Sequence, residues 1–130
     1  MPEQTTETST DGMSYAVPDD LRRVRAFVTE RALTLGLSEA RIDVLTLAVS
    51  ELTTNTLQHT TGGGHIRVWA EAGQLVCDVV DRGEDRPFGR SMPSAEAIRG
   101  RGLAIVERVC DSVDTATVPG GTLVRIRLDL

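Results

Sequence analysis

The stretch Glu51-Leu52-Thr53-Thr54-Asn55 decides the interpretation of this chain, because two other short stretches follow it along the sequence. Asp81-Arg82-Gly83 ends a strand-like run, and Gly100-Arg101-Gly102-Leu103 opens a segment whose apolar residues have helical spacing. Each stretch alone is weak, because a Glu and an Asn at this spacing occur on many helices and Asp-x-Gly is an ordinary turn. Their combination on a helix, a strand and a second helix predicts a nucleotide pocket.

Glu51 and Asn55 lie one turn apart on a single face of the first predicted helix. The core-facing stripe of that helix is mainly apolar and consists of Ile42, Leu45, Ala48, Val49, Leu52 and Thr56. Glu51 and Asn55 border this stripe, beside Ala48. We therefore expect both side chains at the edge of the core and not in open water.

A carboxylate and a carboxamide at such an edge favour a magnesium site. Mg²⁺ takes hard oxygen ligands, keeps several waters and uses few protein ligands together with substrate phosphates. Glu51 could equally act as a general base. The plainer alternative is a solvated Glu and a surface Asn, neither with a function.

Asp81 follows the run Gln74-Leu75-Val76-Cys77-Asp78-Val79-Val80 and is expected at the end of a strand. A carboxylate there can accept a hydrogen bond from the exocyclic amine of adenine, and Gly83 lets the backbone come close to the base. The alternative for Asp81 and Gly83 is a simple turn from strand to loop.

The second helix is expected to begin at Gly100 and to continue through Leu103, Val106, Cys110 and Val113. Glycines at a helix start leave backbone N–H groups free, and these donors and the helix dipole favour a phosphate. Arg99 and Arg101 add positive charge there. A Walker-type P-loop is excluded, because the chain has neither its motif nor any Lys.

Together these residues resemble the GHKL superfamily of ATP-binding domains, which includes gyrase, Hsp90, histidine kinases and MutL and has the Bergerat fold. Within the superfamily, the likeness is strongest to the small anti-sigma factor serine kinases and their bacterial relatives. The family's N box is roughly E-x-x-x-N-x-x-x-H, and Glu51, Asn55 and His59 match it. The resemblance spans about Met13 to Leu130.

Three further motifs carry the resemblance in the family's order. Asp81 and Gly83 match the first glycine box, and Gly100 and Gly102 match the second. A Gly-Thr pair before the last strand is matched by Gly121-Thr122. The resemblance implies that Thr122 contacts both Asp81 and adenine.

The resemblance implies ATP and Mg as cofactors and a protein serine/threonine kinase activity, with Glu51 as the catalytic base and Asn55 as the magnesium ligand. The implied protein substrate is a Ser or Thr of an anti-sigma factor antagonist, and a sigma factor is the other implied partner. The implied ATP-binding residues are Asn55, Asp81, Gly83, Arg99, Gly100, Arg101, Gly102, Leu103 and Thr122.

Asp85 departs from the family pattern, because the first glycine box usually has its second Gly at this position. The departure favours an alternative function, in which the chain is a nucleotide-sensing or nucleotide-blind module that sequesters a partner without catalysis. The retained Glu51 favours the kinase. A detached catalytic domain of a histidine kinase is a third alternative, disfavoured because no second domain with a phosphoacceptor His is evident.

Composition limits the classes of partner. The chain has 130 residues, 40% of them hydrophobic and 3% aromatic, and a net charge of −5, which argues against direct nucleic-acid binding. No apolar run is long enough to cross a membrane and no signal peptide is evident, so we expect a cytoplasmic protein with no membrane contact. Cys77 and Cys110 are expected as small buried residues of a strand and a helix. Whether the chain forms a homodimer stays open.

The predicted fold is an α+β two-layer sandwich, in which helices cover one face of a mixed, mostly antiparallel sheet. Residues 1–12 are expected as a disordered tail and residues 13–130 as a single domain. A short strand at Met13–Val17 precedes a helix that begins at Pro18-Asp19-Asp20, and Gly36 and Ser38 separate that helix from the next. The other predicted strands are His65–Ala70, Gln74–Val80 and Thr122–Leu128, with an ATP lid at Glu84–Arg99.

Overall fold

The structure is a computed structural model that describes residues 11–59, 63–81, 110–119 and 121–130, except for the side chains of Gln58 and His59. In these ranges the elements are β1 (Gly12–Tyr15), α1 (Asp20–Leu35), α2 (Glu39–His59), β2 (Gly64–Glu71), β3 (Gln74–Asp81), β4 (Ser112–Val118) and β5 (Gly121–Asp129). The predicted disordered tail, the predicted ATP lid and the start of the second predicted helix lie outside the described residues, apart from Asp11 and Gly12.

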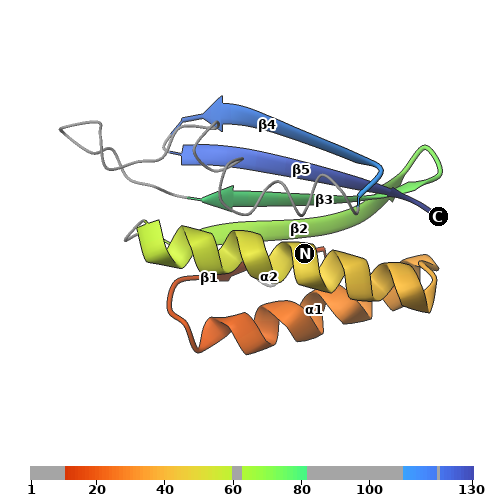
Figure 1. Ribbon diagram of the computed structural model, residues 1–130, viewed down its shortest axis with the longest axis horizontal. Helices are drawn as coiled ribbons and strands as arrows, with labels where there is room; N and C mark the ends of the chain where they lie inside the picture. The colour runs from red at the N-terminus through yellow and green to blue at the C-terminus, as the bar shows by residue number, and fades with distance from the viewer. Residues whose placement is uncertain (1–10, 60–62, 82–109, 120) are drawn as a thin grey trace, which may run out of the picture.

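The five described strands form one sheet in the order β1-β2-β3-β5-β4, and both helices lie side by side against one of its faces (Figure 1). This confirms the predicted α+β fold with helices on one face. The sheet was expected to be mixed, but every pairing between the described strands is antiparallel. Neither described helix is long and apolar enough to cross a membrane.

The core lies between the helices and the sheet. The apolar stripe predicted for the first helix of the site is buried, with Leu45, Ala48 and Val49 fully inaccessible to solvent. It packs against side chains that recur at every second position of the strands, namely Ile66, Val68, Leu75, Cys77, Val79, Val124, Ile126 and Leu128. Helix α1 adds Val24, Val28 and Ala32 to the same core.

The two helices are separated by the residues that the sequence indicated. Gly36 has φ of 97°, a left-handed conformation that Gly adopts without strain, and its N–H reaches the carbonyl of Ala32 at 3.1 Å. The Ser38 hydroxyl then accepts a hydrogen bond from the Arg41 N–H at 3.3 Å and caps the start of α2. The break between the two helices therefore comes from local backbone chemistry.

The segment before β5 corrects the prediction. Cys110 and Val113 were expected on a helix, but Cys110 lies in a bend and Val113 belongs to β4, which pairs along its whole length with β5. The strand was missed because β4 is an edge strand whose apolar residues, Val113, Ala116 and Val118, do not keep to one face. Cys110 is only half-buried, and burial raises the pKa of its thiol to about 11.

Strand β1 begins and ends earlier than predicted. Gly12 already pairs with Arg67 of β2, and the strand stops at Tyr15 because the next two residues turn toward α1. The Asp20 carboxylate holds this turn by accepting hydrogen bonds from the N–H groups of Ala16 at 2.8 Å and Val17 at 3.1 Å. Asp20 therefore joins the end of β1 to the start of α1.

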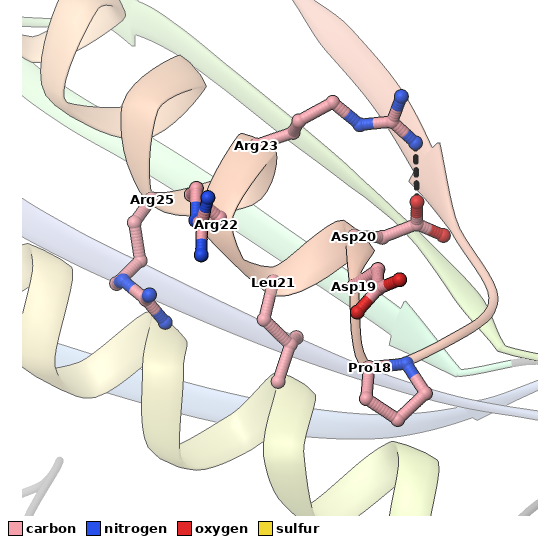
Figure 2. A pocket seen from close by; sticks show the side chains of 7 residues that line it. All are labelled: Pro18, Asp19, Asp20, Leu21, Arg22, Arg23 and Arg25. Carbon is pink, nitrogen blue, oxygen red and sulfur yellow. Dashed lines mark hydrogen bonds and ion pairs between the residues drawn. The ribbon is translucent and has the colours of Figure 1, made fainter.

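The Asp20 turn predicts a pH-dependent contribution to stability. Its backbone hydrogen bonds, with a smaller effect from the Arg23 guanidinium that it pairs with (Figure 2), hold the pKa of Asp20 below its ordinary value. A lowered folded-state pKa stabilises the fold above the ordinary Asp pKa, and this stabilisation is lost as the pH falls through the folded-state value. We expect Asp20→Asn to melt at a lower temperature than wild type at pH 7, with the difference shrinking below about pH 4. Thermal melts across this range test it, and a difference independent of pH would contradict it.

Candidate functional site

One row of residues crosses all five strands at the end of the sheet. Pairing in register aligns Tyr15 of β1, Gly64 of β2, Asp81 of β3, Thr122 of β5 and Thr117 of β4. Figure 1 shows that the C-terminal ends of α2 and β3 and the start of β5 lie at this same end of the molecule. The row therefore brings together the predicted site residues Asp81 and Thr122 at the end of the sheet where α2 finishes.

Asp81 is a buried carboxylate with 7% of its surface exposed. The backbone N–H of Thr122, which is itself buried, donates a hydrogen bond to Asp81 Oδ1 at 3.2 Å. Removing a carboxylate from water is costly unless hydrogen bonds compensate it. The contact between Asp81 and Thr122 that the resemblance implied is present in this hydrogen bond.

Glycines flank Asp81 on both neighbouring strands because there is no space for a side chain. A Cβ on Gly121 would lie 1.7 Å from the Asp81 carbonyl oxygen and 3.0 Å from its Oδ1. A Cβ on Gly64 would lie 2.2 Å from the Val80 carbonyl oxygen. Both distances are too short for any real side chain. Positions 64 and 121, on the strands that flank the end of β3, therefore accept only glycine.

Helix α2 carries two other predicted site residues, Glu51 and Asn55. Glu51 and Asn55 are half-buried, as expected for residues that border the apolar stripe. Thr53 and Thr56 of the same helix are buried and donate hydrogen bonds to the carbonyls of Val49 at 2.8 Å and Leu52 at 3.0 Å. Helix α2 packs on β3. The helix therefore lies next to the strand that carries Asp81.

Tyr15 is a member of this region that the sequence did not single out. Its side chain is 2% exposed, and a Cβ on Gly64 would lie 2.6 Å from its hydroxyl. Burial raises the pKa of Tyr15 well above its ordinary value; the Thr56 hydroxyl counters this and the Asp81 carboxylate adds to it. A signal was present in the sequence, because Tyr15 is the chain's one Tyr among very few aromatic residues.

Several predicted site residues cannot be placed. Gly83, Arg99, Gly100, Arg101, Gly102 and Leu103 lie outside the described residues, as does Asp85. His59 is the last residue of α2, but its side chain is not described. Of the predicted site residues, the structure therefore places Asp81 and Thr122 at the end of the sheet and Glu51 and Asn55 on α2.

A hollow of about 690 Å³ opens elsewhere, at the start of α1 (Figure 2). Its described lining consists of Pro18, Asp19, Asp20, Leu21, Arg22, Arg23 and Arg25. None of these is a predicted nucleotide residue, and the Asp20–Arg23 ion pair already uses two of its charges. The hollow is therefore distinct from the region around Asp81.

The groups around Asp81 and α2 fit Mg-ATP by their chemistry. A buried carboxylate can accept from the amine of a purine, and the close packing at Gly64 and Gly121 fixes the strands around it. Glu51 and Asn55 offer the oxygen atoms that magnesium prefers. No part of this fit depends on the thiols, since Cys77 is fully buried and burial raises its pKa far above neutrality.

Comparison with known proteins gives one family. The model of the histidine kinase-like ATPase domain matches residues 15–128 of the chain. That range contains every predicted site residue. A search of the curated proteins finds no match.

Solved structures share the fold. One contains the RsbU and RsbW domains of Rv1364c from Mycobacterium tuberculosis, with 20% identity, a TM-score of 0.68 and coverage of 92% of this chain and 32% of that one. The histidine kinase domain of the Erythrobacter litoralis EL346 blue-light activated kinase has 22% identity and a TM-score of 0.54, covering 85% of this chain and 59% of that one. The catalytic domain of histidine kinase ThkA has 13% identity and a TM-score of 0.52, covering 92% and 96%. This chain thus spans about a third of the first protein and under two thirds of the second.

The close packing at Gly121 yields a prediction about stability. Gly121→Ala should lower the free energy of unfolding by at least about 1–3 kcal/mol, because β5 must move away from the Asp81 carbonyl. Gly12→Ala is the matched control in a strand, since its Cβ would come no closer than 3.1 Å to side chains and 3.2 Å to the Ile66 carbonyl oxygen, against 1.7 Å at Gly121. Urea unfolding of both variants measures the difference, and equal costs would show that the contact with Asp81 is not what limits this position.

Proposed function

Given that this chain belongs to the histidine kinase-like ATPase domain family, we propose that it binds Mg-ATP between α2 and the end of β3. The family match also confirms the resemblance to GHKL domains that the sequence carries. The observation that supports the site best is the buried Asp81, which is held by the Thr122 N–H and flanked by Gly64 and Gly121.

In this proposal each part of the nucleotide has its own residues. Asp81 accepts the hydrogen bond of the adenine amine, with Thr122 and Gly83 close to the base. Asn55 is the magnesium ligand, and magnesium neutralises charge on the phosphates when it is bound. The phosphate residues that the sequence predicts are Arg99, Gly100, Arg101, Gly102 and Leu103.

We further propose that the chain is a protein serine/threonine kinase. Glu51 accepts the proton of the attacking hydroxyl, whose oxygen bonds to the γ-phosphorus while the bond from that phosphorus to the β,γ-bridging oxygen breaks and ADP leaves. Glu51 is suited to this role because it is half-buried at the border of the core, one helical turn from Asn55.

The proposed protein substrate is a Ser or Thr of an anti-sigma factor antagonist, with a sigma factor as the second partner. This rests on the sequence resemblance and on the fold shared with a structure that contains an RsbW domain. A partner-switching regulator of this kind would act in the cytoplasm, where transcription takes place.

A binding module without catalysis is the second candidate. Asp85 supports it, because it replaces the second Gly of the first glycine box. In this case the chain would sequester its partner, with nucleotide as a signal or with no nucleotide at all. Nucleotide binding and phosphoryl transfer, measured separately, distinguish the two candidates.

Nucleotide binding is tested by thermal stability. A ligand present at about 100 times its Kd adds about 2.7 kcal/mol to the stability of the native state, so Mg-ATP should raise the melting temperature. Asp81→Asn should remove most of this rise, because the amide can still accept from the Thr122 N–H but no longer offers two acceptor oxygens. Asp43→Asn is the matched control, since it makes the same substitution at an exposed position of α2. A wild-type protein with no shift in millimolar Mg-ATP would contradict the proposed site.

Catalysis is tested by labelled phosphate transfer from ATP to a candidate antagonist. Glu51→Gln should bind ATP nearly as well as wild type but transfer phosphate about 10²–10⁴ times more slowly, the usual worth of a general base. Asn55→Ala should lose both binding and transfer. Glu39→Gln, an exposed substitution in the first turn of the same helix, is the control. Equal transfer rates in wild type and Glu51→Gln would remove Glu51 from the catalytic role, and the absence of transfer in wild type that binds ATP would favour the binding module.

A further inference from the structure

The Tyr15 hydroxyl is a buried polar group that the described part of the fold does not satisfy. Its side chain is 2% exposed, and no described group lies in hydrogen-bonding geometry with the hydroxyl. The Thr56 hydroxyl is near enough to lower the pKa of Tyr15, but it does not reach hydrogen-bonding geometry with the Tyr15 hydroxyl, and its own proton goes to the Leu52 carbonyl at 3.0 Å. Buried hydroxyls without partners are uncommon in proteins and call for an explanation.

The backbone explains where this hydroxyl points. Tyr15 and Asp81 are in the same cross-strand row, separated only by Gly64. Two strand spacings, roughly 9–10 Å, are too long for most side chains to bridge, but Gly64 has no side chain. The Tyr15 phenol occupies that space, since its hydroxyl lies 2.6 Å from where a Gly64 Cβ would be. The ring therefore extends across β2 toward the Asp81 carboxylate, which is near enough to raise the pKa of Tyr15.

The protonation state gives this hydroxyl a definite role. Because burial holds the pKa of Tyr15 far above neutrality, the hydroxyl keeps its proton and is a hydrogen-bond donor. Asp81, beside it, is an acceptor. A donor next to an acceptor complements the six-membered ring of adenine, which presents the acceptor N1 next to the donor amine.

We propose that Tyr15 is a specificity-determining residue of the purine site, where its hydroxyl donates a hydrogen bond to N1 of adenine while Asp81 accepts from the amine. The inference rests on the proposed ATP site. It assigns a role to β1, an element that carries none of the predicted motif residues.

The test uses two nucleotides and two variants of the full chain. Tyr15→Phe removes only the hydroxyl, and 1-deaza-ATP keeps the amine but replaces N1 by C–H. By isothermal titration, Tyr15→Phe should weaken ATP binding about five- to tenfold, the worth of one hydrogen bond, and should leave the affinity for 1-deaza-ATP unchanged. Ser14→Ala is the matched control, because it removes a hydroxyl from the neighbouring, exposed position of β1. It should bind both nucleotides like wild type.

The melting temperature without nucleotide separates recognition from packing. If Tyr15 serves recognition, Tyr15→Phe should be at least as stable as wild type, since it removes an unsatisfied buried hydroxyl. Unchanged ATP affinity in Tyr15→Phe, or an equal loss for ATP and 1-deaza-ATP, would overturn the role of Tyr15 while leaving the ATP site intact. A folded wild type that binds no ATP would overturn the proposed site and this inference with it.

Discussion

The burial of one carboxylate at the end of the central strand is the constraint on which the rest of this site depends. Holding the Asp81 carboxyl group, with 7% exposure, away from water is costly unless hydrogen bonds compensate it. The Thr122 N–H supplies part of that compensation. It can do so because β5 pairs with β3 in the register that places Thr122 opposite Asp81. Close backbone packing also requires glycine on both sides of β3, because a Cβ would lie 1.7 Å from the Asp81 carbonyl oxygen at Gly121 and 2.2 Å from the Val80 carbonyl oxygen at Gly64. The position of Asp81 therefore depends on hydrogen bonding to β5 and on glycine in both neighbouring strands.

The alternation of the strand decides which acidic residue serves the site. Residues 75, 77, 79 and 81 of β3 face the helices, so Asp81 lies on the side of α2, whereas Asp78 faces the opposite side. There Asp78 forms a bidentate ion pair with Arg125, whose Nε and Nη2 donate to the two carboxylate oxygens at 2.7 and 2.8 Å. The guanidinium of Arg125 also lies 5.5 Å from the Trp69 ring centre. A shift of register by one residue would exchange the two carboxylates between the faces. The ion pair on the outer face therefore also helps to fix the position of Asp81, because it would be lost in the shifted sheet.

The sequence predicted those parts of the structure that follow from local chemistry. The apolar stripe of α2, the left-handed Gly36 and the Ser38 cap depend on residues within a few positions of each other, and all three are present. Strand β4 was not predicted and the helix expected through Cys110 and Val113 was wrong there, because an edge strand such as Ser112–Val118 gains its order from pairing with β5 and not from its own apolar pattern. Tyr15 was missed for a related reason. Its importance comes from the cross-strand row with Gly64 and Asp81, and the sequence places these residues far apart.

The polar groups at this end of the core make physical sense only together. Tyr15 and Thr56, like Asp81 and Thr122, are buried on the helix side of the sheet, where apolar side chains would pack more favourably. A buried hydroxyl without a partner alone costs about 1–3 kcal/mol, and the opposite end of the same sheet shows the cheaper solution, with Leu75 and Leu128 fully buried. A fold selected only for stability would have extended that apolar packing to the Asp81 row. Rules of packing fail in natural proteins mainly where function requires it, and Thr56, Asp81 and Thr122 are buried with Tyr15 at this end of the core. At the proposed nucleotide site, a ligand that satisfies these hydrogen-bonding groups would recover in binding what the fold gives up in stability.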